Sequence, residues 1–325
     1  MMKNDKIPPV LFVIFNRLDT TQQVFQIFKE VKPARLFIAA DGPRIDKEGE
    51  AEKCDAVRKY VLDNIDWDCD VKTLFQEKNL GCGTGVATAI SWFFEHVEAG
   101  IILEDDCLPH PDFFEYCYDL LEKYHDDENI AIISGDNFQD GKKWGDGSYY
   151  FTKYTNIWGW ATWRRMWNKY QFDVNAYDKD LMNKKINERI KTKREQNFWK
   201  SLFENLATTR RTDVWDYQMN FCSWYNNMRS IVPNVNLIKN VGFGEDATHT
   251  LNMDAKESSI ATKSILPLVH PTKDKIYDKA EAYFFNTYAW PSSSFSRFVG
   301  RIYKVVPSSL ISTYRKVKHW IVSNK

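Results

Sequence analysis

The first 135 residues alternate between short β-rich runs and longer segments with helical periodicity. The β-rich runs cover residues 8–15, 34–40, 69–75, 100–103 and 129–134. Most of them are apolar at nearly every position, which is typical of strands buried on both faces of a parallel sheet. Helical spacing of apolar residues appears between the runs, over about 19–31, 47–64, 82–97 and 110–124. This alternation predicts an α/β fold, a Rossmann-like sandwich of three layers with a largely parallel sheet.

Beyond the fifth run the pattern changes. Residues 136–154 are rich in Gly, Asp, Lys and Tyr, which indicates loops and a hairpin. Helical spacing then returns over about 161–170, 178–191, 196–208 and 214–226, and residues 231–250 predict a strand followed by a polar loop. Trp160, Trp163 and Trp167 have helical spacing along the first of these segments, where a stripe of large side chains is typical of core packing.

Composition places the chain among globular proteins. It has 325 residues, of which 43% are hydrophobic and 27% charged, enough to bury a core. The 44 Lys and Arg balance 44 Asp and Glu, so the net charge gives no indication of a nucleic-acid partner. The residues after Glu281 hold seven basic side chains and no acid, which leaves 37 basic against 44 acidic residues before them. This basic, aromatic segment suits contact with an anionic membrane surface, or packing as a helix on the acidic body.

Cysteine usage and hydropathy bear on the compartment. None of the six cysteines forms a C-x-x-C pair, which argues against a zinc site. No leader-like segment precedes the first predicted strand, and no apolar run reaches the length of a membrane span. We therefore expect reduced thiols in a cytoplasmic protein whose basic C-terminal segment can bind the inner face of the cytoplasmic membrane.

Three consecutive acids follow the fourth predicted strand. Glu104, Asp105 and Asp106 come directly after the apolar run 100–103, and ligands of open α/β sheets bind beyond the carboxyl ends of the strands. Three adjacent carboxylates repel one another unless a positive group joins them. A hard cation, Mg²⁺ or Mn²⁺, would join them and leave positions open for phosphate oxygens. A solvated turn between strand and helix is the alternative.

Two other strand ends carry polar residues. Asn16 and Arg17 follow the first strand and Asp41 follows the second, so a parallel sheet would bring them to the same edge as the acids. Arg17 can bind a phosphate through two donors, and Asn16 or Asp41 can bind the edge of a base. Singly, each is more typical of a helix cap or a turn. Together they outline a nucleotide pocket.

A glycine cluster opens the third predicted helix. Its sequence, GCGTG over residues 81–85, lacks the spacing of the G-x-G-x-x-G fingerprint and follows the third strand instead of the first. We interpret Gly83 as a point of close backbone approach near the bound nucleotide, with simple loop flexibility as the alternative.

Four segments in this order carry a family resemblance: PVLFVIFNR, IAADGPR, NLGCGTGVATAISWFF and IILEDDCLPHPDFFEYC. They resemble glycosyltransferases of the GT-A fold, with the three acids in place of that fold's D-x-D motif. The similarity is closest to bacterial nucleotide-diphospho-sugar transferases with an EDDC motif (HlpA-like) and extends more distantly to N-acetylglucosaminyltransferase I. Downstream, NIWGWATWRRMW, VWDYQMNFCSW and PNVNLIKNVGFGEDATHT resemble the acceptor half of the same family.

The resemblance implies a division of the chain. Residues 1–250 would form the GT-A glycosyltransferase domain, in which 1–135 bind the nucleotide sugar and 136–250 add helices on the acceptor side. Residues 251–325 would be a C-terminal extension with the basic tail.

The resemblance also implies roles for the residues at the strand ends. Asp106 would ligate Mn²⁺ or Mg²⁺, and Asp105 would contact the ribose or a metal-bound water. Glu104 would contact a hydroxyl of the donor sugar. Arg17 and Asp41 would hold the base and the phosphates.

On the acceptor side, the resemblance implies that Asp216 is the catalytic base, which would remove the proton of the acceptor hydroxyl. The family usually has two adjacent acids at this place, whereas here Tyr217 follows Asp216, so Asp213 and Glu245 remain rivals. Trp158 is suited to stacking on an acceptor sugar.

A glycine-bearing loop follows further along the chain. His249 lies in this loop, GFGEDATH over residues 242–249, which could close over the donor and bring the imidazole to the metal or the diphosphate. An ordinary surface position for His249 is the alternative.

These observations predict a metal-dependent glycosyltransferase that inverts the anomeric carbon. It would move a sugar from a nucleotide-diphosphate sugar, with uridine as the expected base, to a glycan or lipid-linked glycan in surface polysaccharide biosynthesis. A sugar-1-phosphate nucleotidyltransferase is one alternative, although it would carry a glycine-rich signature with basic residues after the first strand, where this chain has FNR. A non-catalytic glycan-binding protein that retains the fold is the other, and the intact acids argue against it.

Overall fold

The structure is a computed structural model that describes residues 6–242 and 259–290 of the chain. The chain divides into two units, residues 1–281 and 282–325. The described part of the second unit is the end of α9 (Asp278–Phe284) and a π-helical turn, Phe285–Ala289. All elements that follow belong to the first unit.

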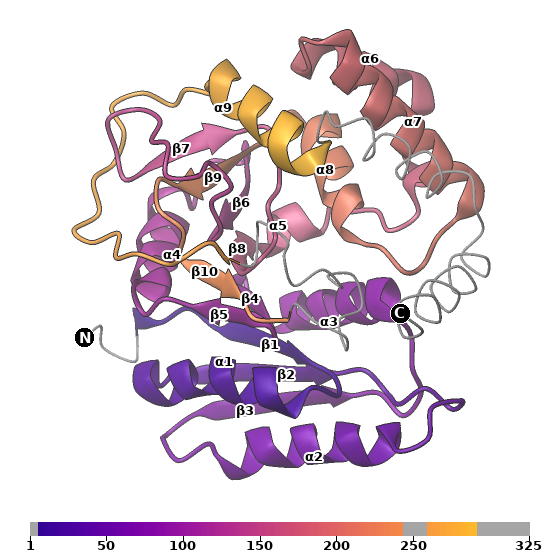
Figure 1. The fold of residues 1–325 in the computed structure, drawn as a ribbon, viewed down its shortest axis with the longest axis vertical. Coiled ribbons are helices and arrows are strands. Elements are labelled where there is room, and N and C mark those ends of the chain that lie inside the picture. Colours follow the sequence, from indigo (N-terminus) through magenta and orange to yellow (C-terminus); the bar gives the residue numbers. More distant parts are fainter. Residues whose placement is uncertain (1–5, 243–258, 291–325) are drawn as a thin grey trace, which may run out of the picture. The chain divides into compact units, whose positions relative to one another are not determined.

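A mixed sheet of eight strands is the centre of the first unit (Figure 1), in the order β3-β2-β1-β4-β8-β6-β9-β7. Strands β1 to β4, and β6 with β9, run in parallel, whereas β8 lies antiparallel between β4 and β6, and β7 lies antiparallel to β9. A separate antiparallel pair joins β5 to β10. The bounds are β1 Val10–Ile14, β2 Arg35–Ala40, β3 Asp70–Phe75, β4 Ala99–Glu104, β5 Cys107–Pro109, β6 Ile130–Ser134, β7 Tyr149–Thr152, β8 Trp160–Trp163, β9 Arg229–Pro233 and β10 Ile238–Asn240.

The helices largely follow the predicted segments. Among the described residues, no helix has both the length and the apolar character needed to cross a membrane. The six cysteines, which all lie in the described part, are free thiols. The bounds are α1 Leu18–Val31, α2 Glu50–Asp63, α3 Cys82–His96, α4 Asp112–Lys123, α5 Arg164–Trp167, α6 Lys179–Arg189, α7 Lys193–Thr209 and α8 Asp216–Tyr225.

Alternation along β1 and β2 creates the predicted layers. In the parallel register Phe12 pairs with Ile38 and Leu11 with Phe37, so Phe12 and Phe37 point to opposite faces of the sheet. Phe12 packs edge-on against Phe28 of α1, with ring centroids 4.9 Å apart. On the other face, Phe37 packs against Phe93 of α3 at 5.0 Å. Helices α1 and α3 therefore cover opposite faces, which confirms a mixed α/β sandwich.

The predicted helix over 161–170 is wrong in its first half, because Trp160 and Trp163 lie in strand β8. Ala161 pairs with Ile101 of β4 on one side and with Ile133 of β6 on the other. Pairing on both sides buries all four residues of β8, and this tertiary context overrides the helical spacing of the tryptophans. The sheet is consequently mixed and not largely parallel. The core role of the tryptophans is confirmed, since all three, including Trp167 of α5, are buried.

The predicted hairpin within residues 136–154 is also wrong. Its one strand, β7, pairs with β9, and Phe151 lies opposite Ile231. The short strand β5 after the acids was not predicted, because three residues carry no readable period.

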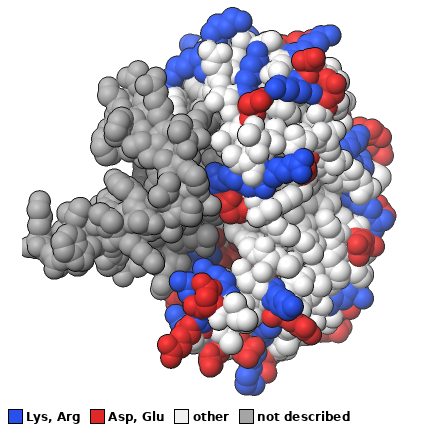
Figure 2. Space-filling view, turned by 90° about the vertical axis from the view of Figure 1, so that its right-hand side faces the viewer, with Lys and Arg blue, Asp and Glu red and all other residues white. Residues whose placement is uncertain are grey.

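Surface charges contribute little to this architecture. On the face turned toward the viewer in Figure 2, basic and acidic side chains lie near one another, with uncharged residues between them. Exposed pairs such as Lys179–Glu204, with Nζ and Oε2 2.6 Å apart, are worth less than about 1 kcal/mol each. The buried aromatic layers hold the fold together.

Replacing Trp160 by Ala tests the position of β8. Its side chain is 1% exposed and stacks on Trp215 with ring centroids 6.0 Å apart. The variant should lose about 3–5 kcal/mol of unfolding free energy, measured by urea denaturation with circular dichroism. A loss below about 1 kcal/mol would contradict the buried central strand.

Candidate functional site

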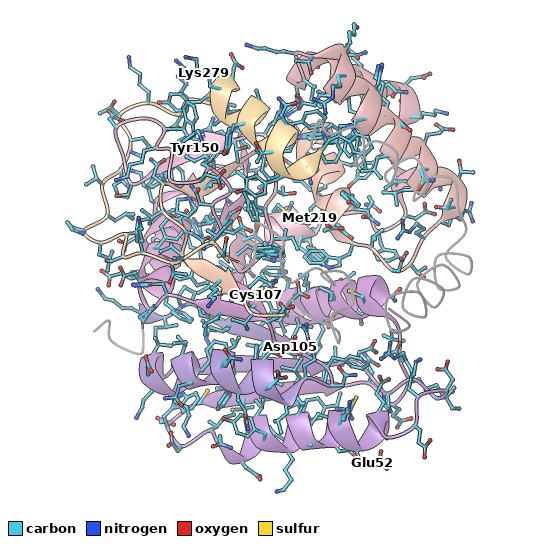
Figure 3. All side chains as sticks on the ribbon, in the orientation of Figure 1. Glu52, Asp105, Cys107, Tyr150, Met219 and Lys279 are labelled. Atoms are coloured by element: carbon cyan, nitrogen blue, oxygen red, sulfur yellow. The ribbon has the colours of Figure 1, made fainter. Side chains whose placement is uncertain are left out.

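Three neighbouring parallel strands bring the predicted polar residues to one edge of the sheet. Ile14 of β1 pairs with Ala40 of β2, and Val13 pairs with Glu104 of β4. The residues that follow these strands therefore leave the sheet side by side, beyond their carboxyl ends. The acids lie where β4 passes into β5, and Figure 3 labels Asp105 and Cys107, which flank Asp106.

Arg17 lies between two of the three acids. Its Nη2 donates to Oδ1 of Asp105 and to Oδ2 of Asp106, the latter at 3.0 Å. Asp105 is 3% exposed, and a buried carboxylate needs a partner of opposite charge. The predicted partner of Arg17, together with Asp41, was the base and the phosphates of a nucleotide. In the structure its guanidinium is the positive group that joins the acids.

One guanidinium does not neutralise three carboxylates. Burial and the charges of Asp106 and Asp105 raise the pKa of Glu104 to about 8, although Arg17 acts in the opposite direction. Burial also raises the pKa of Asp105 to about 6, against the effect of Arg17. Within the described residues, the Oδ2 atom of Asp105 has no hydrogen-bond partner and is buried. The cluster therefore has more negative charge than its surroundings compensate.

The β5–β10 pair covers this cluster. Val241, directly after β10, donates its backbone N–H to the carbonyl oxygen of Asp106 at 2.8 Å. A Cβ atom on Gly242 would come closer than 3.0 Å to the side chains of Asp106 and Arg17. Only glycine lets the backbone pass this close. Gly242 begins the loop over residues 242–249 that was predicted to close over the donor, and the rest of that loop lies outside the described residues.

Asp216 lies at the start of α8. Its charge is one of the causes that raise the pKa of Glu104. Trp215, the residue before it, stacks on Trp160 of β8, which fixes the start of α8 against the strand next to β4. A first-turn position also suits an ionised carboxylate, because the helix dipole is positive there.

The rivals of Asp216 are less suited or lie elsewhere. Arg211 holds Asp213 with two hydrogen bonds, Nε to Oδ1 at 2.8 Å and Nη2 to Oδ2 at 2.6 Å. This bidentate pair engages both carboxylate oxygens of Asp213. Glu245 and His249 lie outside the described residues, as does the basic C-terminal segment.

Gly83 makes the predicted close approach, but to the protein's own chain. A Cβ atom there would come closer than 3.0 Å to backbone atoms of Thr212 and Val214. The neighbouring Thr84 donates its N–H to the Thr212 carbonyl at 3.2 Å. The glycine thus docks the start of α3 onto the segment that leads to Asp216.

Asn16 and Asp41 make internal contacts. The Asn16 amide donates to Oε1 of Glu50 at 3.0 Å. Asp41 accepts the backbone N–H groups of Leu80 and Gly81, at 2.8 and 3.0 Å, and the Asn79 amide at 3.0 Å. The Asp41 contacts brace the loop before α3, and the Asn16 contact reaches the start of α2. Base binding by Asn16 or Asp41 stays a prediction.

A buried acid that the sequence analysis missed lies beyond the end of β6. Asp136 is 1% exposed, and its Oδ2 accepts the backbone N–H of Trp158 at 3.0 Å. Burial raises the pKa of Asp136 to about 8. The Trp158 ring packs edge-on against Phe138 at 5.1 Å, and its stacking on a sugar stays a prediction. Asp136 follows strand β6 as Asp41 follows β2. A search for polar residues just after each predicted strand would therefore have found Asp136.

The acids offer only part of a metal site. Among the described residues, no group of three or more His, Cys, Asp or Glu side chains is arranged to hold a metal ion. A cation bound here would use the oxygens of Asp106 or Glu104 and would need further ligands, such as phosphate oxygens.

Comparisons with known proteins add little. No family model matches the chain, and no curated protein matches it. Among solved structures, HddC from Yersinia pseudotuberculosis matches with a TM-score of 0.30 and 8% identity over 50% of this chain and 80% of that one. HddC in complex with GMP-PN matches with a TM-score of 0.29 and 9% identity over 49% of this chain and 77% of that one. A 4-diphosphocytidyl-2C-methyl-D-erythritol synthase from Anaerococcus prevotii matches with a TM-score of 0.31 and 11% identity over 61% and 99%. Likeness at this level carries no conclusion about activity.

Replacing Glu104 by Gln tests the charge imbalance. The Glu104 carboxyl has a pKa of about 8 in the folded state and an ordinary value of 4.5. Between these values the folded state binds more protons than the unfolded state, so stability falls as pH rises. The amide removes this penalty and should raise the unfolding free energy above pH 8 by about 1–3 kcal/mol.

Urea denaturation at a series of pH values measures this effect, with Glu122→Gln on the exposed face of α4 as the control. Near pH 4 the two proteins should have nearly equal stability, because the folded parent is then protonated at Glu104. A variant that is less stable than the parent at high pH would show that the carboxylate is compensated.

Proposed function

We propose that this protein is a glycosyltransferase that binds a nucleotide-diphosphate sugar at the carboxyl edge of β1 and β4. The proposal rests on one observation. Three consecutive carboxylates lie at the end of β4, and the guanidinium of Arg17 pairs with two of them. A buried cluster with excess negative charge favours binding of a further cation. A diphosphate that arrives with a divalent cation would supply both the charge and the missing ligands.

The donor set suits Mn²⁺ or Mg²⁺, which prefer carboxylate and phosphate oxygens. Asp106 would hold the cation, Asp105 with its unpaired Oδ2 would orient the ribose, and Glu104 would accept a hydroxyl of the donor sugar. Bound there, a divalent cation neutralises the charge that develops on the leaving diphosphate. Arg17 would then exchange one of its carboxylate contacts for a phosphate oxygen.

Asp216 is the proposed base. Its carboxylate would accept the proton of the acceptor hydroxyl while that oxygen bonds to the anomeric carbon. The bond from this carbon to the diphosphate oxygen breaks, and the nucleoside diphosphate leaves with the bonding electrons. A single displacement of this kind inverts the anomeric configuration, and a product of retained configuration would refute it.

A sugar-1-phosphate nucleotidyltransferase is the second candidate, because the same edge of the sheet can bind a nucleotide. One feature of this chain favours the glycosyltransferase. Residues Phe15 to Arg17 pass directly from β1 into α1, so no glycine-rich loop follows the first strand to hold a triphosphate. The products distinguish the two: pyrophosphate from a nucleotidyltransferase, a nucleoside diphosphate from a glycosyltransferase.

The acceptor would be a glycan or a lipid-linked glycan of a surface polysaccharide. The basic C-terminal segment would bring the enzyme to the inner face of the cytoplasmic membrane by its attraction to anionic lipids.

Asp106→Ala tests the metal and donor assignment. Thermal unfolding of the parent should shift upward in a UDP-sugar with Mn²⁺, because ligand at about 100 times its Kd adds about 2.7 kcal/mol to stability. Asp106→Ala should lose the Mn²⁺-dependent part of this shift, whereas Asp66→Ala, at an exposed position between α2 and β3, should keep it. An equal shift in Asp106→Ala would remove Asp106 from the metal site.

Asp216→Asn tests the base. Release of nucleoside diphosphate from the donor should fall by about 10²–10⁴-fold, while the thermal shift by donor and Mn²⁺ persists. Asp213→Asn is the matched control and should keep most of the activity. The reverse result would transfer the role to Asp213.

A further inference from the structure

A groove of about 740 Å³ lies between α3, α5 and the loop that follows α5. Its volume is in the range of sites that bind small molecules or segments of larger ligands. Thr84, Thr88 and Ser91 of α3 form one wall. The aromatic rings of Trp167 and Tyr170 contribute to the other. None of the roles assigned above uses this groove.

The aromatic wall is rigid. The rings of Trp167 and Tyr170 stack nearly parallel, with centroids 4.3 Å apart and planes inclined by 11°. Trp167 donates its Nε1–H to Oγ of Ser91 at 3.0 Å, and Tyr170 donates its hydroxyl to the carbonyl oxygen of Trp215 at 2.9 Å. Trp167 is itself 6% exposed, so the half-buried Tyr170 supplies the ring that a ligand can reach. A flat ring fixed in this way binds an apolar ligand face at little entropic cost.

The remaining lining offers uncharged hydrogen-bonding groups. Thr84 and Thr88 are half-buried and one helical turn apart on α3. Within the described residues, the side chains of Thr88 and Asn168 make no hydrogen bond, and both line the groove. Hydroxyl and amide groups beside an aromatic face match the two kinds of surface on a sugar ring, its hydroxyls and its C–H face.

The charges in the groove disfavour an anion. Arg164 is already paired with Oε1 of Glu98 and donates its Nε–H to the carbonyl of Val97 at 3.2 Å. Glu95 adds an exposed carboxylate to the lining. A phosphate or an acidic ligand would meet this negative charge without a free cation in the described lining.

One end of the groove meets the segment that leads into α8. Thr84 bonds to the Thr212 carbonyl through its N–H, and Tyr170 bonds to the carbonyl of Trp215, which precedes Asp216. At the start of the same α3 helix, Cys82 lies close enough to Glu104 and Asp216 for both to raise its pKa. A chain lying in the groove would therefore extend toward the proposed base.

We propose that this groove is a binding subsite for an uncharged oligosaccharide, which holds the acceptor chain at sugars remote from the one that reacts. The inference rests on the proposed glycosyltransferase function, which it extends by assigning a subsite for the glycan acceptor and by narrowing that acceptor to an uncharged chain. Such a subsite would select acceptors by length, since a longer chain covers more of the groove.

Thr88→Trp tests the subsite by filling the groove. The probe is an array of uncharged bacterial surface oligosaccharides, to which the labelled parent protein should bind. Thr88→Trp should lose at least about tenfold in binding, whereas Thr208→Trp, an exposed helical threonine on α7, should bind as the parent does. Asn168→Ala, an exposed position, is the milder variant and should weaken binding about 2- to 10-fold through a lost hydrogen bond.

The outcomes separate this inference from the proposed function. If no oligosaccharide on the array binds the parent, or if Thr88→Trp and Asn168→Ala both bind as the parent does, the subsite is refuted. The thermal shift by UDP-sugar with Mn²⁺ should persist in both variants. If that shift is absent already in the parent while oligosaccharide binding depends on Thr88, the groove binds glycans but the transferase assignment fails.

Discussion

The ion pair that Arg17 makes with both Asp105 and Asp106 is the interaction on which the site depends. The pair keeps these charged side chains buried, where an unpaired carboxylate or an unpaired guanidinium would lower the stability of the fold. It also leaves the cluster unbalanced, because Glu104 adds a third carboxylate without a second cation. Burial and the neighbouring carboxylates together raise the pKa of Glu104 and of Asp105. A site in this state gains free energy when a ligand brings positive charge, and this is the physical argument for the proposed metal–diphosphate partner.

The scaffold holds these charges through backbone pairing more than through side-chain packing. Parallel pairing sets the end of β1 beside the end of β4, and the β5–β10 pair lays Gly242 over Asp106. Hydrogen bonds to Asp41 brace the loop before α3. Residues at the ends of β1, β2 and β4 thus divide into two groups: the acids and Arg17, which pair with one another, and Asn16 with Asp41, which support the loops around them.

The segment before α8 connects the acid cluster with the groove. Gly83 lets α3 dock onto it, Trp160 stacks on Trp215, and Tyr170 bonds to the Trp215 carbonyl. A rigid connection of this kind would hold a donor and an acceptor in one orientation, and such positioning contributes a large part of the rate of group-transfer reactions. Trp160 therefore has a second role besides core packing, because its stacking on Trp215 positions the start of α8.

The sequence by itself determined the α/β class, most of the helices, and the placing of the acids at the end of a buried strand, because these follow from local periodicity and from the chain order of strand and turn. It did not reveal β8, since pairing with β4 and β6 overrides the helical spacing of its tryptophans. Only the tertiary structure decided that Arg17 pairs with Asp105 and Asp106, that Gly83 approaches Thr212, and that Asp136 is buried. Those contacts join residues far apart in the chain, and no local pattern encodes such distances.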